Sequence, residues 1–173
     1  MSKVEERLAA ASLTLPEPPT PLGNYVGAKT VGKLVYLSGH GPREADGSYI
    51  TGKVPSVCSA DAAYDAARLV GVNCLASLKA EIGDLDRVRQ VVKVLGMVNA
   101  DATFADHPKV INGFSDLMVE AFGDPGRAAR SAVGGSVWPT APGCGRSGPS
   151  AGLAETSSRG RRDDRALAVP ESC

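Results

Sequence analysis

The clearest pattern of apolar positions along the chain lies between residues 60 and 82. Apolar side chains recur there at steps of three and four residues, at Ala63, Ala67, Val70, Cys74, Leu78 and Ile82. Polar residues such as Asp61, Asp65 and Arg68 lie off this stripe. The spacing predicts an amphipathic helix with one face packed on a sheet, and Gly83 is expected to end it.

Several short apolar runs predict strands. Residues 33–38 follow Gly32 and are rich in apolar and aromatic side chains, and residues 88–98 form a longer run. We expect a short strand at 23–26 and another at 129–133. Asp46-Gly47 predicts a turn that leads to Tyr49-Ile50.

A second helix is expected from Asp106-His107-Pro108 to Gly123, because a polar cap precedes a proline in its first turn. Its apolar positions are Val110, Phe114, Leu117, Met118 and Ala121. The order of strands, helix, strand, helix and strand predicts an α+β fold in which two helices cover one face of a sheet.

Residues 1–21 differ from the rest and are expected to form an N-terminal extension. Ser2 and Glu5 have the spacing of a capping box, which predicts a short helix reaching about Leu13. Four prolines between residues 16 and 21 then favour an extended linker. We expect a packed or frayed extension without chemistry of its own.

Composition and charge narrow the functional class. The chain has 173 residues, and its 19 basic residues balance 19 acidic ones, which gives no overall field that would favour nucleic acid or an anionic membrane. There is no pattern of a secretory signal and no long apolar run, so a cytoplasmic location is expected. Four cysteines without CxxC spacing make reduced thiols a better expectation than a zinc site.

Four motifs then occur in a recognisable order and spacing. They are Pro21-Leu22-Gly23-Asn24-Tyr25-Val26, Val35-Tyr36-Leu37-Ser38-Gly39-His40, Asn112-Gly113-Phe114 and Arg127-Ala128-Ala129-Arg130-Ser131. In this arrangement the chain resembles the RidA family, also called YjgF/YER057c/UK114 or the L-PSP endoribonuclease family. The resemblance covers about residues 21–134 and predicts a RidA-like domain at 22–134. It is greatest to longer members with a helical, proline-linked extension.

The resemblance implies a chorismate-mutase-like fold, a homotrimer and ligand clefts between subunits. It implies hydrolysis of 2-imino or enamine acids to 2-keto acids and ammonia, without a metal or organic cofactor. Arg130 would bind the substrate carboxylate, and Tyr25 would line the cleft across the interface. Ser38 and Gly39 would form the wall of the cleft. Asn112 would lie nearby, and Ala132 would offer backbone hydrogen bonds.

Each of these residues also has a structural interpretation. An arginine near a strand is commonly a solvated or ion-paired surface group. Tyr25 could be a half-buried strand aromatic, and Asn112 an exposed helix residue. His40, beside the predicted Ser-Gly wall, is more often a hydrogen-bonded structural histidine than a proton-transfer group.

Two further functions remain open at this point. One is a non-catalytic trimer that binds small carboxylates, and the other is the endoribonuclease activity attached to some family members. The balanced charge disfavours RNA as a substrate.

The tail at 135–173 departs from the family pattern. Family members continue into one more strand, which supplies a catalytic glutamate. Here Gly, Pro, Ser and Arg dominate, a composition that predicts disorder and a missing final strand. We therefore expect weak or absent hydrolysis.

The origin of the tail is a separate hypothesis. It could arise from a reading-frame shift near codon 134 or be a genuine extension. Read one base later, possible codons for Pro142 to Gly148 can spell Asp-Val-Asp-Glu-Val-Asp, an alternation of the missing kind. The nucleotide sequence decides between the two origins.

Overall fold

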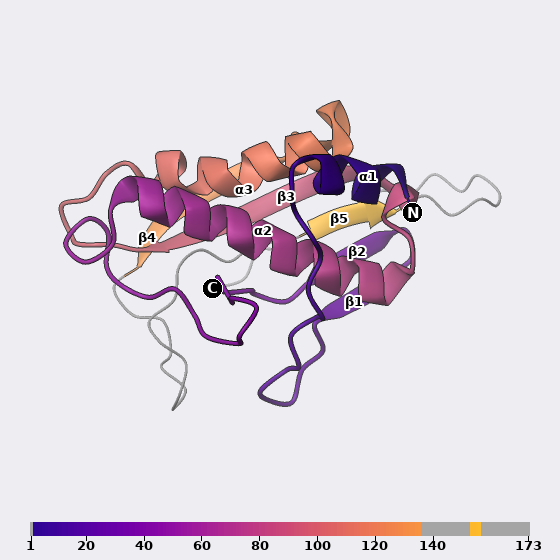
Figure 1. Cartoon of the computed structure of the whole chain (residues 1–173), viewed down its shortest axis with the longest axis horizontal. Helices are drawn as coiled ribbons and strands as arrows, with labels where there is room; N and C mark the ends of the chain where they lie inside the picture. Colours follow the sequence, from indigo (N-terminus) through magenta and orange to yellow (C-terminus); the bar gives the residue numbers. More distant parts are fainter. Residues whose placement is uncertain (1, 136–152, 157–173) are drawn as a thin grey trace.

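The computed structural model describes residues 2–135 and 153–156 of the chain. Its elements form a sheet with two long helices on one face (Figure 1). In chain order they are α1 (Lys3–Ala10), β1 (Ala28–Val31), β2 (Leu34–Leu37), α2 (Ala60–Ile82), η1 (Leu85–Arg87), β3 (Val88–Asn99), α3 (His107–Phe122), η2 (Asp124–Gly126), β4 (Ala129–Gly135) and β5 (Leu153–Thr156). This arrangement confirms the predicted α+β fold.

The strands lie in the order β1-β2-β5-β3-β4. β1 pairs with β2, and β5 pairs with both β2 and β3, in antiparallel fashion. β3 and β4 are parallel because α3 carries the chain back across the sheet between them. Their register places Arg130 opposite Val94 and Ala132 opposite Gly96.

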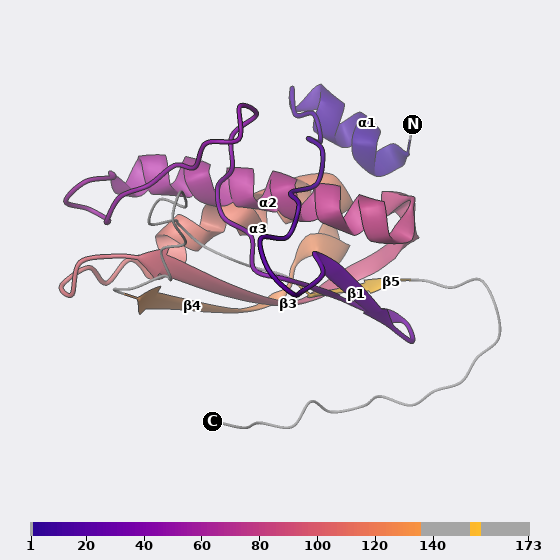
Figure 2. The ribbon, with the colours of Figure 1, turned by 90° about the horizontal axis from the view of Figure 1, so that it is seen from below.

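The two long helices pack against each other and against the sheet. The Ser59 side chain accepts a hydrogen bond from the backbone N–H of Ala62 and caps α2, whose last residue precedes Gly83 at φ +80°. Buried side chains of α2 and α3, including Val70 and Leu117, form the core with Val94 of β3. Figure 2 shows both helices on the same side of the sheet.

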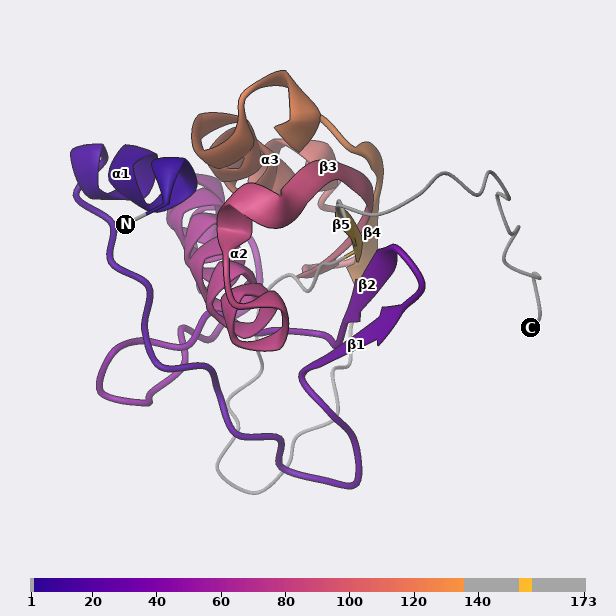
Figure 3. The ribbon, with the colours of Figure 1, turned by 90° about the vertical axis from the view of Figure 1, so that its right-hand side faces the viewer.

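The N-terminal extension is packed rather than frayed. α1 has the predicted capping box, and its Val4 and Leu8 side chains are buried. The Asp86 carboxylate accepts the backbone N–H groups of Lys3 and Val4 at 2.9 and 3.0 Å, and Glu5 pairs with Lys79 of α2. α1 therefore forms an outer layer on the two helices, on the side away from the sheet (Figure 3).

The prediction of a strand at 23–26 is wrong. This segment forms bends, and the first strand begins at Ala28. Gly23 and Gly27 interrupt the run on either side, and the Tyr25 and Val26 side chains are more than half exposed. The segment is attached to the end of β2 instead, through Ser38 Oγ donating to Val26 O at 2.6 Å.

The expectation of a missing final strand is corrected by β5. Four residues, Leu153 to Thr156, pair with β2 on one side and β3 on the other, with register irregularities along β3. Their sequence, Leu-Ala-Glu-Thr, contains neither Gly nor Pro and is compatible with a strand. The average composition of the tail did not indicate this short segment. The predicted disorder concerns 136–152 and 157–173, which lie outside the described residues.

Within 2–135 and 153–156, no helix combines the length and the apolar character that a membrane span requires.

Candidate functional site

Arg130 is held by two neutral oxygen atoms of α3. Its Nη1 donates to Asn112 Oδ1 at 2.9 Å and to Ser115 Oγ at 2.9 Å. Asn112 and Ser115 are three residues apart and so lie on one face of the helix. The structure therefore brings Arg130 and Asn112 together and adds Ser115. The resemblance implied that Asn112 would lie nearby.

This arrangement fixes the guanidinium group without neutralising it. Among residues 2–135, Arg130 forms no ion pair with a carboxylate. Both of these hydrogen bonds use Nη1, which leaves the edge formed by Nε and Nη2 without a described partner. That edge has the geometry of a bidentate carboxylate-binding fork.

Ala132 follows Arg130 on β4 after one residue and is half-buried. It lies opposite Gly96, where an added Cβ would come within 2.6 Å of the Ile111 side chain. The close packing of Gly96 against α3 holds this part of β3, and with it β4, near the helix that carries Asn112.

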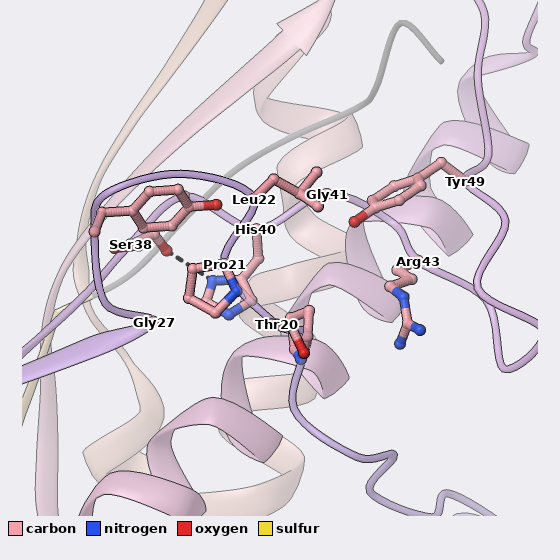
Figure 4. A pocket seen from close by; sticks show the side chains of 12 residues that line it. Thr20, Pro21, Leu22, Gly27, Ser38, His40, Gly41, Arg43 and Tyr49 are labelled. Carbon is pink, nitrogen blue, oxygen red and sulfur yellow. Dashed lines mark hydrogen bonds between the residues drawn. The ribbon is translucent and has the colours of Figure 1, made fainter. Parts of the chain in front are cut away.

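The other predicted residues surround a separate cavity of about 60 Å³ (Figure 4). It lies where the proline-linked segment crosses the end of β2 and the loop that follows. Its lining comprises Pro19, Thr20, Pro21, Leu22, Tyr25, Gly27, Ser38, Gly39, His40, Gly41, Arg43 and Tyr49. Tyr25, Ser38 and Gly39 are thus brought together as expected.

His40 is a structural member of this wall. Its ring is buried and lies between two partners: Nδ1 is 2.7 Å from Ser38 O, and Nε2 is 2.7 Å from Ser77 Oγ on α2. Burial lowers the pKa of His40, partly opposed by the hydrogen bond to the Ser38 carbonyl. The neutral tautomer donates from Nδ1 and accepts from Ser77, so both ring nitrogens are occupied.

The same cavity contains residues that sequence reasoning missed. Arg43 and Tyr49 face each other across an isolated antiparallel bridge, and both line the cavity. The predicted Asp46-Gly47 turn was the available signal, since a tight turn brings flanking residues into opposition. Ser77 had no comparable signal, because its contact with His40 joins positions 37 residues apart.

The predicted residues therefore form two groups on one chain. Arg130, Asn112 and Ala132 belong to the β4–α3 group, and none of them lines the cavity that contains Tyr25, Ser38 and Gly39.

The described thiols are poorly suited to nucleophilic chemistry. Cys74 is buried in the core, and burial raises its pKa strongly. Burial also raises the pKa of Cys58, whose thiol donates to Ser59 O at 3.6 Å.

Comparison with known proteins identifies the family. A family model described as "YjgF/chorismate mutase-like, putative endoribonuclease" matches residues 5–145. The chain belongs to this family. This match confirms the predicted resemblance to the RidA family, for which YjgF is another name. The chain is also 35% identical over 133 residues to Protein TCP17 of Trypanosoma cruzi, covering 76% of this chain and 83% of that protein.

Solved structures confirm the chorismate-mutase-like fold. Protein Atu1372 from Agrobacterium tumefaciens is 36% identical, with a TM-score of 0.80, covering 89% of this chain and 93% of its own. A protein from Shewanella oneidensis described as a "putative endoribonuclease" is 33% identical, with a TM-score of 0.81 and coverage of 88% and 98%. Escherichia coli TdcF, solved with bound serine, shares the fold at 19% identity and a TM-score of 0.58, over 83% of this chain and 96% of its own.

Proposed function

We propose that this member of the YjgF family binds small 2-imino acids through Arg130 and hydrolyses them to 2-keto acids and ammonia. The observation that carries the proposal is the guanidinium of Arg130, oriented by Asn112 and Ser115 with one fork edge available. A planar cation held by neutral oxygens matches a carboxylate in both geometry and charge.

The proposed chemistry suits such an anchor. The carbon of a 2-imine is electrophilic, especially when its nitrogen is protonated. Water adds to this carbon and loses a proton to give a carbinolamine, a proton moves to the amino group, and collapse of the hydroxyl to a carbonyl expels ammonia. The protein contributes by fixing the carboxylate, positioning one water and assisting proton transfer.

The separation of the two groups supports a site shared between copies of the chain. Arg130 and Asn112 would come from one subunit, and Tyr25, Ser38 and Gly39 from its neighbour. A homotrimer would also cover the sheet face opposite the helices. Three strands expose large apolar side chains on that face, at Val31, Leu95 and Val133.

We expect the rate to be lower than that of a relative with the family's glutamate. Arg130 has no carboxylate partner among residues 2–135. The backbone register pairs Glu155 of β5 with Leu34 and Gln90, whereas Arg130 of β4 pairs with Val94. The same feature favours the second candidate, a trimer that binds 2-keto or 2-imino acids without turnover.

The test is ammonia release from 2-iminobutanoate generated enzymatically in the assay. Wild type should release ammonia faster than the buffer reaction but slower than a family member that has the family's glutamate, and Arg130→Ala should match buffer. Binding of 2-oxobutanoate with no acceleration would favour the non-catalytic binder. A rate equal to that of the relative with the glutamate would refute the expected impairment.

A parallel incubation with RNA tests whether the protein has endoribonuclease activity. We expect no cleavage that depends on Arg130, since the chain carries no net charge.

A further inference from the structure

A small hairpin places Arg43 and Tyr49 together at one end of the cavity. The two residues form an antiparallel bridge, and Glu44 N donates to Ser48 O at 2.8 Å inside the turn. In Figure 4, Arg43 and Tyr49 lie on one side of the pocket, and Ser38 and His40 lie on the other. The cavity thus has a neutral end and a cationic end.

A side chain of α2 holds the backbone of Arg43 in place. Asn73 is almost completely buried, and its Nδ2 donates to Gly41 O at 3.2 Å and to Arg43 O at 3.1 Å. The guanidinium lies against the turn at Gly47, where an added Cβ would be 3.4 Å from Arg43 Nη2. A side chain with a fixed backbone and a supported head group loses less entropy on binding a ligand.

The acidic residues next to Arg43 in the sequence do not form ion pairs with its guanidinium group. Asp46 Oδ1 accepts the Ser48 N–H at 2.8 Å, a bond that lowers the pKa of Asp46, and Glu44 Oε2 accepts Ser48 Oγ at 2.9 Å. Both carboxylates therefore bond to Ser48. Within residues 2–135, Arg43 forms no ion pair, although Asp46 is close enough to interact through space.

We propose that Arg43, with Tyr49 beside it, binds a second carboxylate, so that the substrates of this protein are 2-imino acids with an acidic side chain. The inference rests on the proposed function, in which Arg130 of a neighbouring copy binds the carboxylate next to the imine. The substrate side chain would then extend past Ser38 and Tyr25 to the cationic end of the cavity. A volume of about 60 Å³ suits a short aliphatic chain.

The experiment compares two keto acids of equal length, 2-oxoglutarate and 2-oxopentanoate, which differ in a terminal carboxylate against a methyl group. Binding to the full chain is measured by titration calorimetry. Wild type should bind 2-oxoglutarate about tenfold more tightly or better, as expected for a charge-assisted pair. Arg43→Leu should abolish this preference while changing 2-oxopentanoate binding less than about twofold, because that acid lacks the group that Arg43 contacts.

Two matched variants complete the design. Arg43→Lys keeps the charge and should retain part of the preference. Arg127→Leu removes an arginine that is exposed and absent from the cavity lining, and should leave the preference unchanged.

The outcomes separate this inference from the proposed function. Equal affinity of wild type for both acids, or an unchanged preference in Arg43→Leu, would overturn the inference and leave the proposed function standing. Failure of wild type to bind either acid would overturn both. Equal losses for both acids in Arg43→Leu would assign Arg43 a general structural role and reject its specificity for the second carboxylate.

Discussion

His40 and Arg130 show how two polar residues beside family motifs acquire different roles. His40 is buried with both ring nitrogens bonded, and burial lowers its pKa. Arg130 is only half-buried, and only one of its nitrogens has described partners. Available bonding capacity, rather than residue type, is the reason that we propose Arg130 as the ligand-binding group of the pair.

The lowered pKa of His40 predicts a pH dependence of stability. The folded pKa lies below the ordinary value of about 6.5, so the unfolded chain binds a proton more readily. The stabilisation that His40 provides through this pKa difference is complete above about pH 6.5, and it is lost as the pH falls from there to the folded pKa. Urea unfolding of wild type should show a falling free energy between pH 7.5 and 5.5, by at most about 1.4 kcal/mol per pH unit from this group.

His40→Gln provides the comparison. It should be less stable at pH 7.5, because Ser38 and Ser77 lose their partner, but its stability should fall less steeply between pH 7.5 and 5.5. If the free energy of unfolding changed equally with pH in the variant and in wild type, the assigned role of His40 would be contradicted. The lowered pKa values of Glu5, Asp46 and Asp86 act at lower pH, outside this window.

At the residue scale, the sequence was informative where a motif or a helical repeat constrained neighbours. Arg130 and Asn112 were predicted through the family motifs, and the structure places them in contact. Ser115 could have been found from its three-residue spacing to Asn112. Ser77 and Asn73 could not, since their partners lie 30 or more residues away and no periodicity encodes such contacts.

At the scale of elements, the crossing of α2 and α3 depends on Gly113. A Cβ added there would lie 2.0 Å from the backbone oxygen of Tyr64, so the helices approach at their backbones. Gly71 also lies at this contact, but an added Cβ would meet the side-chain tips of Leu117 and Met118. The family motif Asn112-Gly113-Phe114 thus joins a packing glycine to a site residue.

Gly113→Ala should therefore destabilise the protein by about 2 kcal/mol or more, since neither backbone can yield without separating the helices. Gly71→Ala is the matched comparison. Flexible side chains can move there, and alanine favours a helix by about 1 kcal/mol relative to glycine, so its net effect should be small. Urea unfolding measures both, and equal costs for the two substitutions would count against this view of the crossing.

The predicted elements succeeded where periodicity was long. α2 occupies the predicted range of 60–82, because 23 residues of repeat and a terminal glycine define it. The strand predicted at 23–26 does not form, because two glycines interrupt its apolar run on either side. β5 was missed because its four residues lie within a Gly- and Pro-rich tail, and its pairing partners are remote in sequence.

At the scale of the whole molecule, the helices of the described residues cover one face of the sheet and leave the other face open. Val94 and Val98 of β3 point to the covered face and are buried, so Leu95 and Met97 point the other way. Leu95 is 47% exposed and Val133, opposite Met97, is 44% exposed. This open face is where neighbouring copies would pack in the proposed trimer.

Leu95→Lys should accordingly dissociate the trimer, because a charge at a buried interface is costly. Light scattering after size exclusion measures the mass. Val57→Lys, at a position 74% exposed in the loop before α2, should leave the mass unchanged. A monomeric wild type, or a trimer that tolerates Leu95→Lys, would reject the open face as the interface.

The most direct test of the central claim is calorimetric titration of 2-oxobutanoate into wild type and Arg130→Ala, with Arg127→Ala as a control that removes an exposed arginine three residues away. We predict that wild type and Arg127→Ala bind with the same affinity, and that Arg130→Ala loses about tenfold or more in affinity, because the carboxylate loses its charged partner. Unchanged binding to Arg130→Ala would contradict the assignment of Arg130 as the carboxylate anchor.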